Sequence, residues 1–185
     1  VDLKMGKKGI ILDRDGVINY DNHGVGKISD FEFIPGVFES LTRLQDAGYL
    51  LTIVTNQGGR IDKGYFSSED YQKVNEWMLE RFSEKGIKIE KVYSCLHASS
   101  ENCDCRKPKP GMLNQAIKEL DLDELNSWLI GDKISDLQMG KASDCGKILL
   151  ESEYVQDLDC FKLKDLTEAA DYILSGNSKP IYELF

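Results

Sequence analysis

Short apolar runs alternate along the chain with segments of helical periodicity, and no other feature restricts the fold as much. Runs of this length, bounded by polar residues, are typical of strands that are buried on both faces of a sheet. The candidate strands are residues 9–12, 49–54, 89–94, 127–130 and 146–150, with residues 172–174 as a weaker sixth candidate.

Between the candidate strands, apolar residues recur every three or four positions, as they do on the buried face of a helix. Strands that alternate with helices predict an α/β fold, a doubly wound, mainly parallel, Rossmann-like sheet with helices on both faces. The candidate helices are residues 37–47, ended by Gly48, then a helix that begins at Ser67 or Ser68 and carries Tyr71, Val74, Trp77, Met78 and Phe82, then residues 112–120 and residues 135–142.

The 185 residues contain no internal repeat, low-complexity tract or linker, which predicts a single domain over residues 5–185. Val1 to Lys4 precede Met5, and we expect them to be a cloning remnant outside the fold. No apolar run is long enough to span a bilayer, and no charged-then-apolar leader is recognisable. We therefore expect a cytoplasmic protein, and we expect it to be a monomer.

The charge of the chain excludes two classes of partner. With 23 basic and 32 acidic residues, the formal charge is −9 at pH 7, which repels nucleic acid and anionic membranes. Such a protein can still bind a small phosphorylated metabolite, but only where donors and cations are gathered locally. Three of the five cysteines lie within eleven residues, a pattern that favours metal ligation in a reducing compartment over a disulfide framework.

Polar residues follow the candidate strands at the edge where parallel α/β sheets bind ligands. The first strand is followed by Asp13, Arg14, Asp15 and Gly16. A carboxylate can attack phosphorus when a metal neutralises its charge, and a second carboxyl group can transfer the protons. An isolated pair of this kind is equally typical of solvated acids in a turn, so the other strand ends decide.

Those other strand ends carry groups that suit a phosphate. Thr55, Asn56 and Gln57 come before two glycines, and a hydroxyl beside turn N–H groups can cradle a phosphoryl oxygen. Residues 106–111 contain three cations and two stiffening prolines, which makes a local positive site in an acidic chain. Asp132 ends the fourth strand and can complete an oxygen site for Mg²⁺ with Asp13, while Asp136 is expected to play a supporting role.

Together these motifs, over residues 9–150, resemble the haloacid dehalogenase superfamily of phosphatases that form an aspartyl-phosphate. The resemblance implies Mg²⁺-dependent hydrolysis of a phosphate ester. It implies that Asp13 is the nucleophile and a Mg²⁺ ligand, Asp15 the general acid/base with its main-chain carbonyl on the metal, Thr55 the phosphoryl-holding hydroxyl, Lys107 the charge-stabilising cation, and Asp132 the third metal ligand.

A cluster of cysteines and a histidine lies directly before Arg106 and Lys107. Its members are Cys95, His97, Cys103 and Cys105. Three thiolates and an imidazole make a complete tetrahedral zinc shell that leaves no open position for a catalytic water, so we interpret the zinc as structural. The alternative is a set of unligated surface thiols. Cys145 and Cys160 are expected to be ordinary core residues.

This zinc loop followed by Arg-Lys-Pro resembles one branch of the superfamily, which contains heptose 1,7-bisphosphate 7-phosphatases and histidinol-phosphatases. Members of the branch lack a large cap domain, which implies that loops 18–34, 57–66 and 95–110 cover the substrate. Residues 30–37 and 109–112 are similar to the heptose enzymes, so the resemblance favours the heptose 7-phosphate over histidinol phosphate. The substrate-binding residues it implies are Asp21, Asn22, His23, Asn56, Arg106 and Lys133.

Three functions outside this branch fit the sequence less well. A 3′-phosphatase acting on nucleic acid shares the catalytic motifs, but the acidic charge argues against it. A signalling module that stores a phosphoryl group on an aspartate is also disfavoured. An acid two residues after the nucleophile, as at Asp15, promotes hydrolysis of the aspartyl-phosphate instead of its storage. A zinc-stapled scaffold without catalysis does not explain why Asp13, Thr55, Lys107 and Asp132 occur together.

Overall fold

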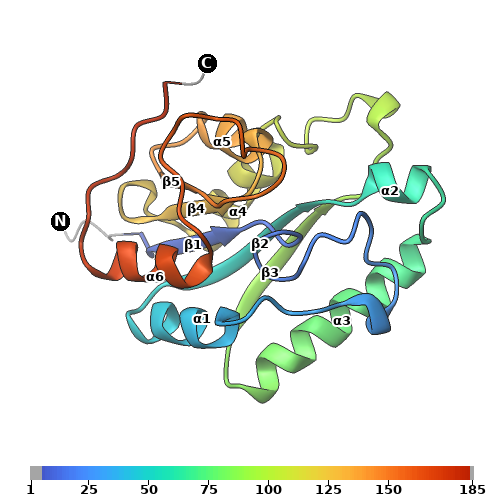
Figure 1. Cartoon of the computed structure of the whole chain (residues 1–185), viewed down its shortest axis with the longest axis horizontal. Helices are drawn as coiled ribbons and strands as arrows, with labels where there is room; N and C mark the ends of the chain where they lie inside the picture. Colours follow the sequence, from blue (N-terminus) through green and yellow to red (C-terminus); the bar gives the residue numbers. More distant parts are fainter. Residues whose placement is uncertain (1–5, 184–185) are drawn as a thin grey trace.

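The computed structural model describes residues 6–183, so the expected remnant at residues 1–4 lies outside the described part of the chain. Five strands form one sheet in the order β3-β2-β1-β4-β5, and every neighbouring pair is parallel (Figure 1). This confirms the predicted parallel sheet. The strands are β1 (Gly9–Leu12), β2 (Leu50–Asn56), β3 (Ile89–Cys95), β4 (Trp128–Gly131) and β5 (Gly146–Leu149).

Helices cover both faces of the sheet, as a doubly wound fold requires (Figure 1). Alternate residues of β1 point to opposite faces, so Ile10 and Leu12 join one core and Ile11 joins another. The first core is covered by α1 (Val37–Asp46), α3 (Ser68–Glu84) and α6 (Leu166–Leu174). The second is covered by α4 (Gly111–Leu120) and α5 (Ile134–Gly140).

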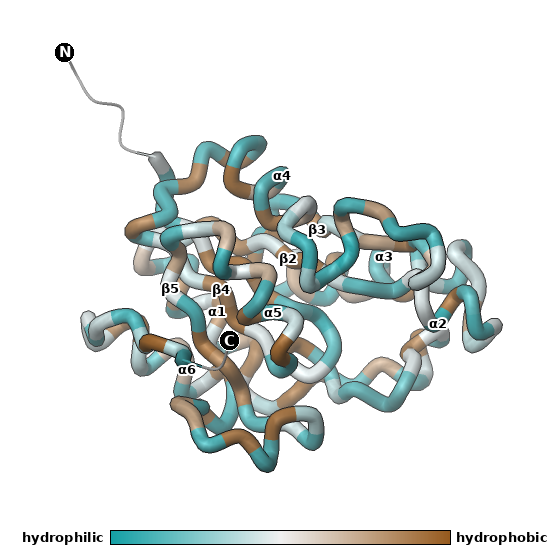
Figure 2. Tube along the Cα trace, turned by 90° about the horizontal axis from the view of Figure 1, so that it is seen from above, coloured by the Kyte–Doolittle hydropathy of each residue, from teal (hydrophilic) through white to brown (hydrophobic). Residues whose placement is uncertain are grey.

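Helix α3 shows how the sequence sets these elements. The Ser67 hydroxyl accepts from the Asp70 N–H at 3.1 Å and the Asp70 carboxylate accepts from the Ser67 N–H at 3.1 Å, a capping box that confirms the predicted start. Hydrophobic and hydrophilic residues alternate along the helices (Figure 2). In α3 the buried stripe is Tyr71, Val74, Met78 and Phe82.

The weaker sixth strand candidate, residues 172–174, is wrong, because these residues form the last turn of α6. Asp165 accepts from the N–H groups of Thr167 and Glu168 and so starts a helix there. The buried residues of α6 have helical spacing; they are Leu166, Ala169, Ala170 and Ile173. Residues 172–174 alone are too few to show this spacing.

The register brings the strand ends to one edge of the sheet. Leu12 pairs with Ile53 on one side and with Ile130 on the other, so the residues that follow β1, β2 and β4 emerge together. Around this edge, the described residues form loops and short helices instead of a large cap domain. The short helices there are α2 (Gly58–Asp62), η1 (Ile28–Asp30) and η2 (Ser99–Glu101), whereas η3 (Glu124–Asn126) precedes β4 at the opposite edge of the sheet. No helix within residues 6–183 is long and apolar enough to cross a membrane.

Candidate active site

The carboxyl ends of β1 and β2 open into a cavity of about 430 Å³. Asp21 and Asp132 line a neighbouring cavity of about 540 Å³, and exposed Asn22 lines neither of the two. The structure therefore brings most of the predicted site residues to one place. Those that line the first cavity are Asp13, Asp15, His23, Thr55, Asn56, Arg106, Lys107 and Lys133.

Asp13, directly after β1, is buried against a fixed positive charge. Lys107 Nζ lies 2.9 Å from Asp13 Oδ1 and donates to Asp136 Oδ1 at 2.7 Å. Burial alone would lower the pKa of Lys107, but Asp13 and Asp136 raise it above its usual value, so the ammonium stays charged. A fixed cation beside a carboxylate suits a site where a phosphoryl group gathers negative charge.

Asp15, two residues further on, is held by four donating side chains. Burial raises its pKa, but Arg14 and Arg60 outweigh burial and hold the pKa of Asp15 well below its usual value. Its carboxylate is therefore fixed in orientation at the cavity wall. The donors are Arg14 Nη2 at 2.9 Å, Asn19 Nδ2 at 2.9 Å, Gln57 Nε2 at 2.8 Å and Arg60 Nη1 at 3.3 Å.

None of these four donors was predicted from the sequence as a site residue. Gln57 is fully buried and donates to Thr55 Oγ1 at 2.8 Å as well as to Asp15. Arg14 is also fully buried, with its guanidinium over the rings of Phe31 and Tyr71. Both lie inside the recognised motifs, so their positions could have marked them; Arg60 lies on α2, a helix that the sequence analysis treated as a turn.

The carboxylates beside Asp13 fit a divalent cation. Asp13, Asp132 and Asp136 can each offer an oxygen, and these oxygens lie within 4.8 Å of one another. Both Asp132 oxygens are buried without a hydrogen-bond partner among the described residues, and burial, then the charge of Asp13, raises the pKa of Asp132 to about 8. The Asp136 oxygens accept from Lys107 Nζ and the Lys133 N–H, so they are already used. This geometry fits Asp13 and Asp132 as ligands and Asp136 as support.

Gly16 makes room for this arrangement. Its φ is +89°, and a Cβ at this position would lie 2.2 Å from Asp132 Oδ2. The turn after Asp15 therefore requires glycine, both for its backbone conformation and for the close approach of Asp132.

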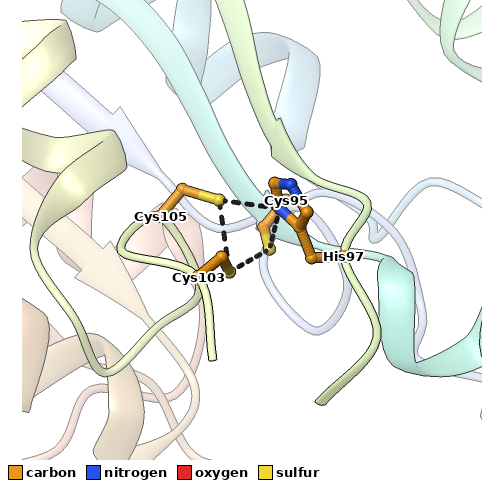
Figure 3. Close-up of side chains that lie close together, drawn as sticks. All are labelled: Cys95, His97, Cys103 and Cys105. Atoms are coloured by element: carbon orange, nitrogen blue, oxygen red, sulfur yellow. Dashed lines mark hydrogen bonds between the residues drawn. The ribbon is translucent and has the colours of Figure 1, made fainter. Parts of the chain in front are cut away.

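The four predicted zinc ligands point toward one another from the end of β3 and the loop that follows it (Figure 3). The sulfur atoms of Cys95 and Cys103 are 3.6 Å apart, and those of Cys103 and Cys105 are 3.5 Å apart. His97 Nδ1 lies 3.2 Å from the Cys105 sulfur. These separations match the edges of a tetrahedron whose metal–ligand bonds are about 2.0–2.3 Å long, so the residues fit Zn²⁺.

The predicted substrate-binding residues have different surroundings. Asn56 exchanges two hydrogen bonds of 3.1 Å with the backbone of Lys107, so its amide fixes the main chain at Lys107. His23 stands at a φ of +58° in the loop and faces the cavity. The Arg106 guanidinium has no partner among the described residues and lies against Gly59, where a Cβ would come within 2.9 Å of it. Arg106 is therefore free to bind an anion.

Comparisons with known proteins agree with this geometry. A family model described as HAD-hydrolase-like matches residues 104–175. The chain is 46% identical to the D-glycero-alpha-D-manno-heptose-1,7-bisphosphate 7-phosphatase of Campylobacter jejuni, over 91% of the chain and 96% of that protein. It is 46% identical to the corresponding beta-heptose enzyme of Pasteurella multocida, over 74% of the chain and 77% of that protein.

A solved structure has the same fold. The D,D-heptose 1,7-bisphosphate phosphatase from B. bronchiseptica, complexed with magnesium and phosphate, superposes with a TM-score of 0.82 at 27% identity, covering 91% of this chain and 98% of that one. The resemblance inferred from the strand ends is confirmed. This chain belongs to the haloacid dehalogenase-like hydrolases and is a phosphomonoester hydrolase of the heptose bisphosphate phosphatase family.

Proposed function

We propose that the chain hydrolyses the 7-phosphate of D-glycero-D-manno-heptose 1,7-bisphosphate through an aspartyl-phosphate on Asp13. The observation that carries the proposal is the position of buried Asp13, 2.9 Å from the charged Lys107 and two residues from Asp15, at the wall of an open cavity. The names of the relatives favour heptose bisphosphate over histidinol phosphate.

In the first step, a carboxylate oxygen of Asp13 attacks phosphorus and the bond between phosphorus and the ester oxygen breaks. The negative charge of a bound phosphate beside Asp15 raises the pKa of its carboxyl group, so that Asp15 would enter this step protonated and give that proton to the departing sugar oxygen. Lys107 and Thr55 hold the other phosphoryl oxygens. Gln57 fixes the positions of the Thr55 and Asp15 side chains relative to each other, because it donates to both at 2.8 Å.

In the second step, Asp15 takes a proton from water, and the water oxygen attacks the phosphorus of the aspartyl-phosphate. The bond between phosphorus and the Asp13 oxygen breaks, inorganic phosphate leaves, and the carboxylate is restored. One residue serves as acid and then as base, so its four donors must hold it in reach of both the ester oxygen and the water.

Two metals belong to this proposal. Asp13, Asp132 and the main-chain carbonyl of Asp15 would hold Mg²⁺, which neutralises negative charge on the nucleophile and on the phosphoryl group. Cys95, His97, Cys103 and Cys105 would hold a structural Zn²⁺, which fixes the loop that carries Arg106 and Lys107. The unpartnered oxygens of Asp132 support the first assignment, and the clustered thiols support the second.

Two cations of the cavity lining, Arg106 and Lys63, suit a second phosphate. Arg106 Nη1 is buried without a hydrogen-bond partner among the described residues. Histidinol phosphate would bring a cationic amine into the same cavity, where Arg106 repels it. We therefore expect kcat/KM to be at least about tenfold higher for the heptose bisphosphate, as one charge-assisted contact can supply.

The test is phosphate release from both compounds, with ³¹P NMR to show which phosphate of the sugar leaves. Arg106→Ala should bring the two kcat/KM values closer together, chiefly because it weakens binding of the heptose bisphosphate. Equal efficiency on the two compounds, or release of the 1-phosphate, would contradict the assigned substrate.

A further inference from the structure

The Asp21 carboxylate is enclosed by donors from four separate segments. Its Oδ1 accepts from Arg60 Nη2 at 2.5 Å and from the His23 N–H at 3.2 Å. Its Oδ2 accepts from Lys133 Nζ at 3.0 Å and from the Tyr154 hydroxyl at 2.9 Å. A carboxylate offers about four lone-pair positions, so the protein itself uses all of them. This surrounding favours a positioning role for Asp21 over a direct contact with the sugar.

Both cations on Asp21 also stand beside a catalytic carboxylate, and both are closer to Asp21. Lys133 Nζ lies 3.0 Å from Asp21 Oδ2 but 3.9 Å from Asp132 Oδ1. Arg60 lies 2.5 Å from Asp21 Oδ1 but 3.3 Å from Asp15 Oδ2. Asp21 thus competes with Asp132 for one cation and with Asp15 for the other.

The competition at Asp132 matters most, because no other side chain within residues 6–183 pairs with its carboxylate. Lys133 follows Asp132 directly in the chain, so its flexible side chain can reach the free carboxylate oxygens of its neighbour. What draws the ammonium away is the Asp21 carboxylate, together with the Tyr154 ring, whose centroid lies 4.4 Å from Lys133 Nζ. An ammonium on Asp132 would oppose a metal ion at the same oxygens.

We propose that Asp21 is a positioning residue that holds Lys133 away from Asp132 and so keeps the Asp132 carboxylate available to the divalent cation. Tyr154 is its partner in this role, since its hydroxyl donates to the oxygen that holds Lys133. The inference rests on the Mg²⁺ site of the proposed function, and it assigns to the loop at 20–24 a task that does not require contact with substrate.

The test measures metal binding without turnover. Protein desalted without chelator, so that the zinc loop stays intact, is titrated with Mn²⁺ at low ionic strength, and free Mn²⁺ is counted by electron paramagnetic resonance. Asp21→Asn should raise the Kd for Mn²⁺ about tenfold, since Lys133 would then approach Asp132 by about 1 Å. Tyr154→Phe should raise it by a smaller factor.

The matched control is Tyr20→Phe, at a tyrosine of similar exposure whose hydroxyl has no partner among the described residues, and it should leave the Kd unchanged. Lys133→Met should bind Mn²⁺ at least as tightly as the unaltered protein. Adding Lys133→Met to Asp21→Asn should restore tight binding, because the competing ammonium is gone. Loss of loop structure alone would not be rescued in this way.

Two results would overturn the inference while leaving the proposed function in place. One is an unchanged Kd in Asp21→Asn and Tyr154→Phe; the other is a double variant that binds as weakly as Asp21→Asn. If Asp21→Asn fails to fold, the same comparison of Mn²⁺ Kd values is made with Tyr154→Phe, Lys133→Met and the double variant of the two. A double variant that binds as weakly as Tyr154→Phe would then overturn the inference. If Asp132→Asn binds Mn²⁺ as the unaltered protein does, the metal site itself is wrong and the inference falls with it.

Discussion

Replacing Gln57 with leucine is expected to lower kcat much more than it lowers stability. Gln57 Nε2 donates to Asp15 Oδ2 and to Thr55 Oγ1, each at 2.8 Å. The bond to the charged carboxylate contributes about 1.5–3 kcal/mol, and the bond to the hydroxyl about 0.5–1.5 kcal/mol. The same substitution removes Gln57 Oε1, a buried acceptor without a partner among the described residues, whose burial costs about 1–3 kcal/mol. The free energy of unfolding should therefore fall by only about 1 kcal/mol.

Turnover has no such compensation, because Asp15 and Thr55, the proposed proton-transferring carboxylate and phosphoryl-holding hydroxyl, lose the donor that they share. We expect kcat to fall about 10- to 100-fold. Urea unfolding gives the stability and steady-state phosphate release gives kcat. The control is Gln45→Leu, which also removes two hydrogen bonds, to Gly86 and Lys88, but between α1 and the start of β3. A kcat within twofold of the unaltered protein, or equal losses in both Gln→Leu variants, would refute the reasoning.

The remaining predictions concern the zinc loop and a surface network. Cys103→Ser should lower the zinc content measured by elemental analysis and raise KM, since the loop that carries Arg106 and Lys107 loses a zinc ligand. A full zinc content in this variant would contradict the proposed structural zinc site. Glu119 accepts from Lys91, Gln115 and Tyr93, and these bonds lower its pKa from 4.5 to about 2. A carboxylate with a lowered pKa contributes stability above its unfolded pKa and loses it as pH falls through the folded value. Glu119→Gln should therefore lower Tm at neutral pH, and the difference in Tm from the unaltered protein should fade below pH 4.5; a difference independent of pH would count against this network.

The strand ends could be predicted from the sequence because two local signals coincide there. Apolar runs mark the buried strands, and parallel topology brings their carboxyl ends to one edge, so the sequence alone predicts that Asp13, Thr55 and Asp132 lie close together. The run at residues 172–174 shows the limit of this signal, because three apolar residues fit either period. Its identity as a helix depends on Asp165 and on the stripe that precedes it.

The contacts around the catalytic carboxylates could not be predicted in the same way. The Asp21 carboxylate meets Lys133 and Tyr154 across 112 and 133 positions of the chain. A short polar loop such as residues 20–24 is equally typical of a sugar-binding loop and of a cluster bound to its own protein. Only the packing of α2 and of the loop around Tyr154 shows which donors face Asp21.

The central claim is that Asp13 carries the phosphoryl group. It is tested most directly by quenching the enzyme in acid during turnover of heptose 1,7-bisphosphate, reducing it with borohydride, and sequencing the peptides by mass spectrometry. Reduction converts an aspartyl-phosphate into homoserine, so we expect homoserine at position 13 only when substrate and Mg²⁺ are both present. An unmodified Asp13 in protein that is turning over, or homoserine at Asp15 or Asp132 instead, would contradict the account.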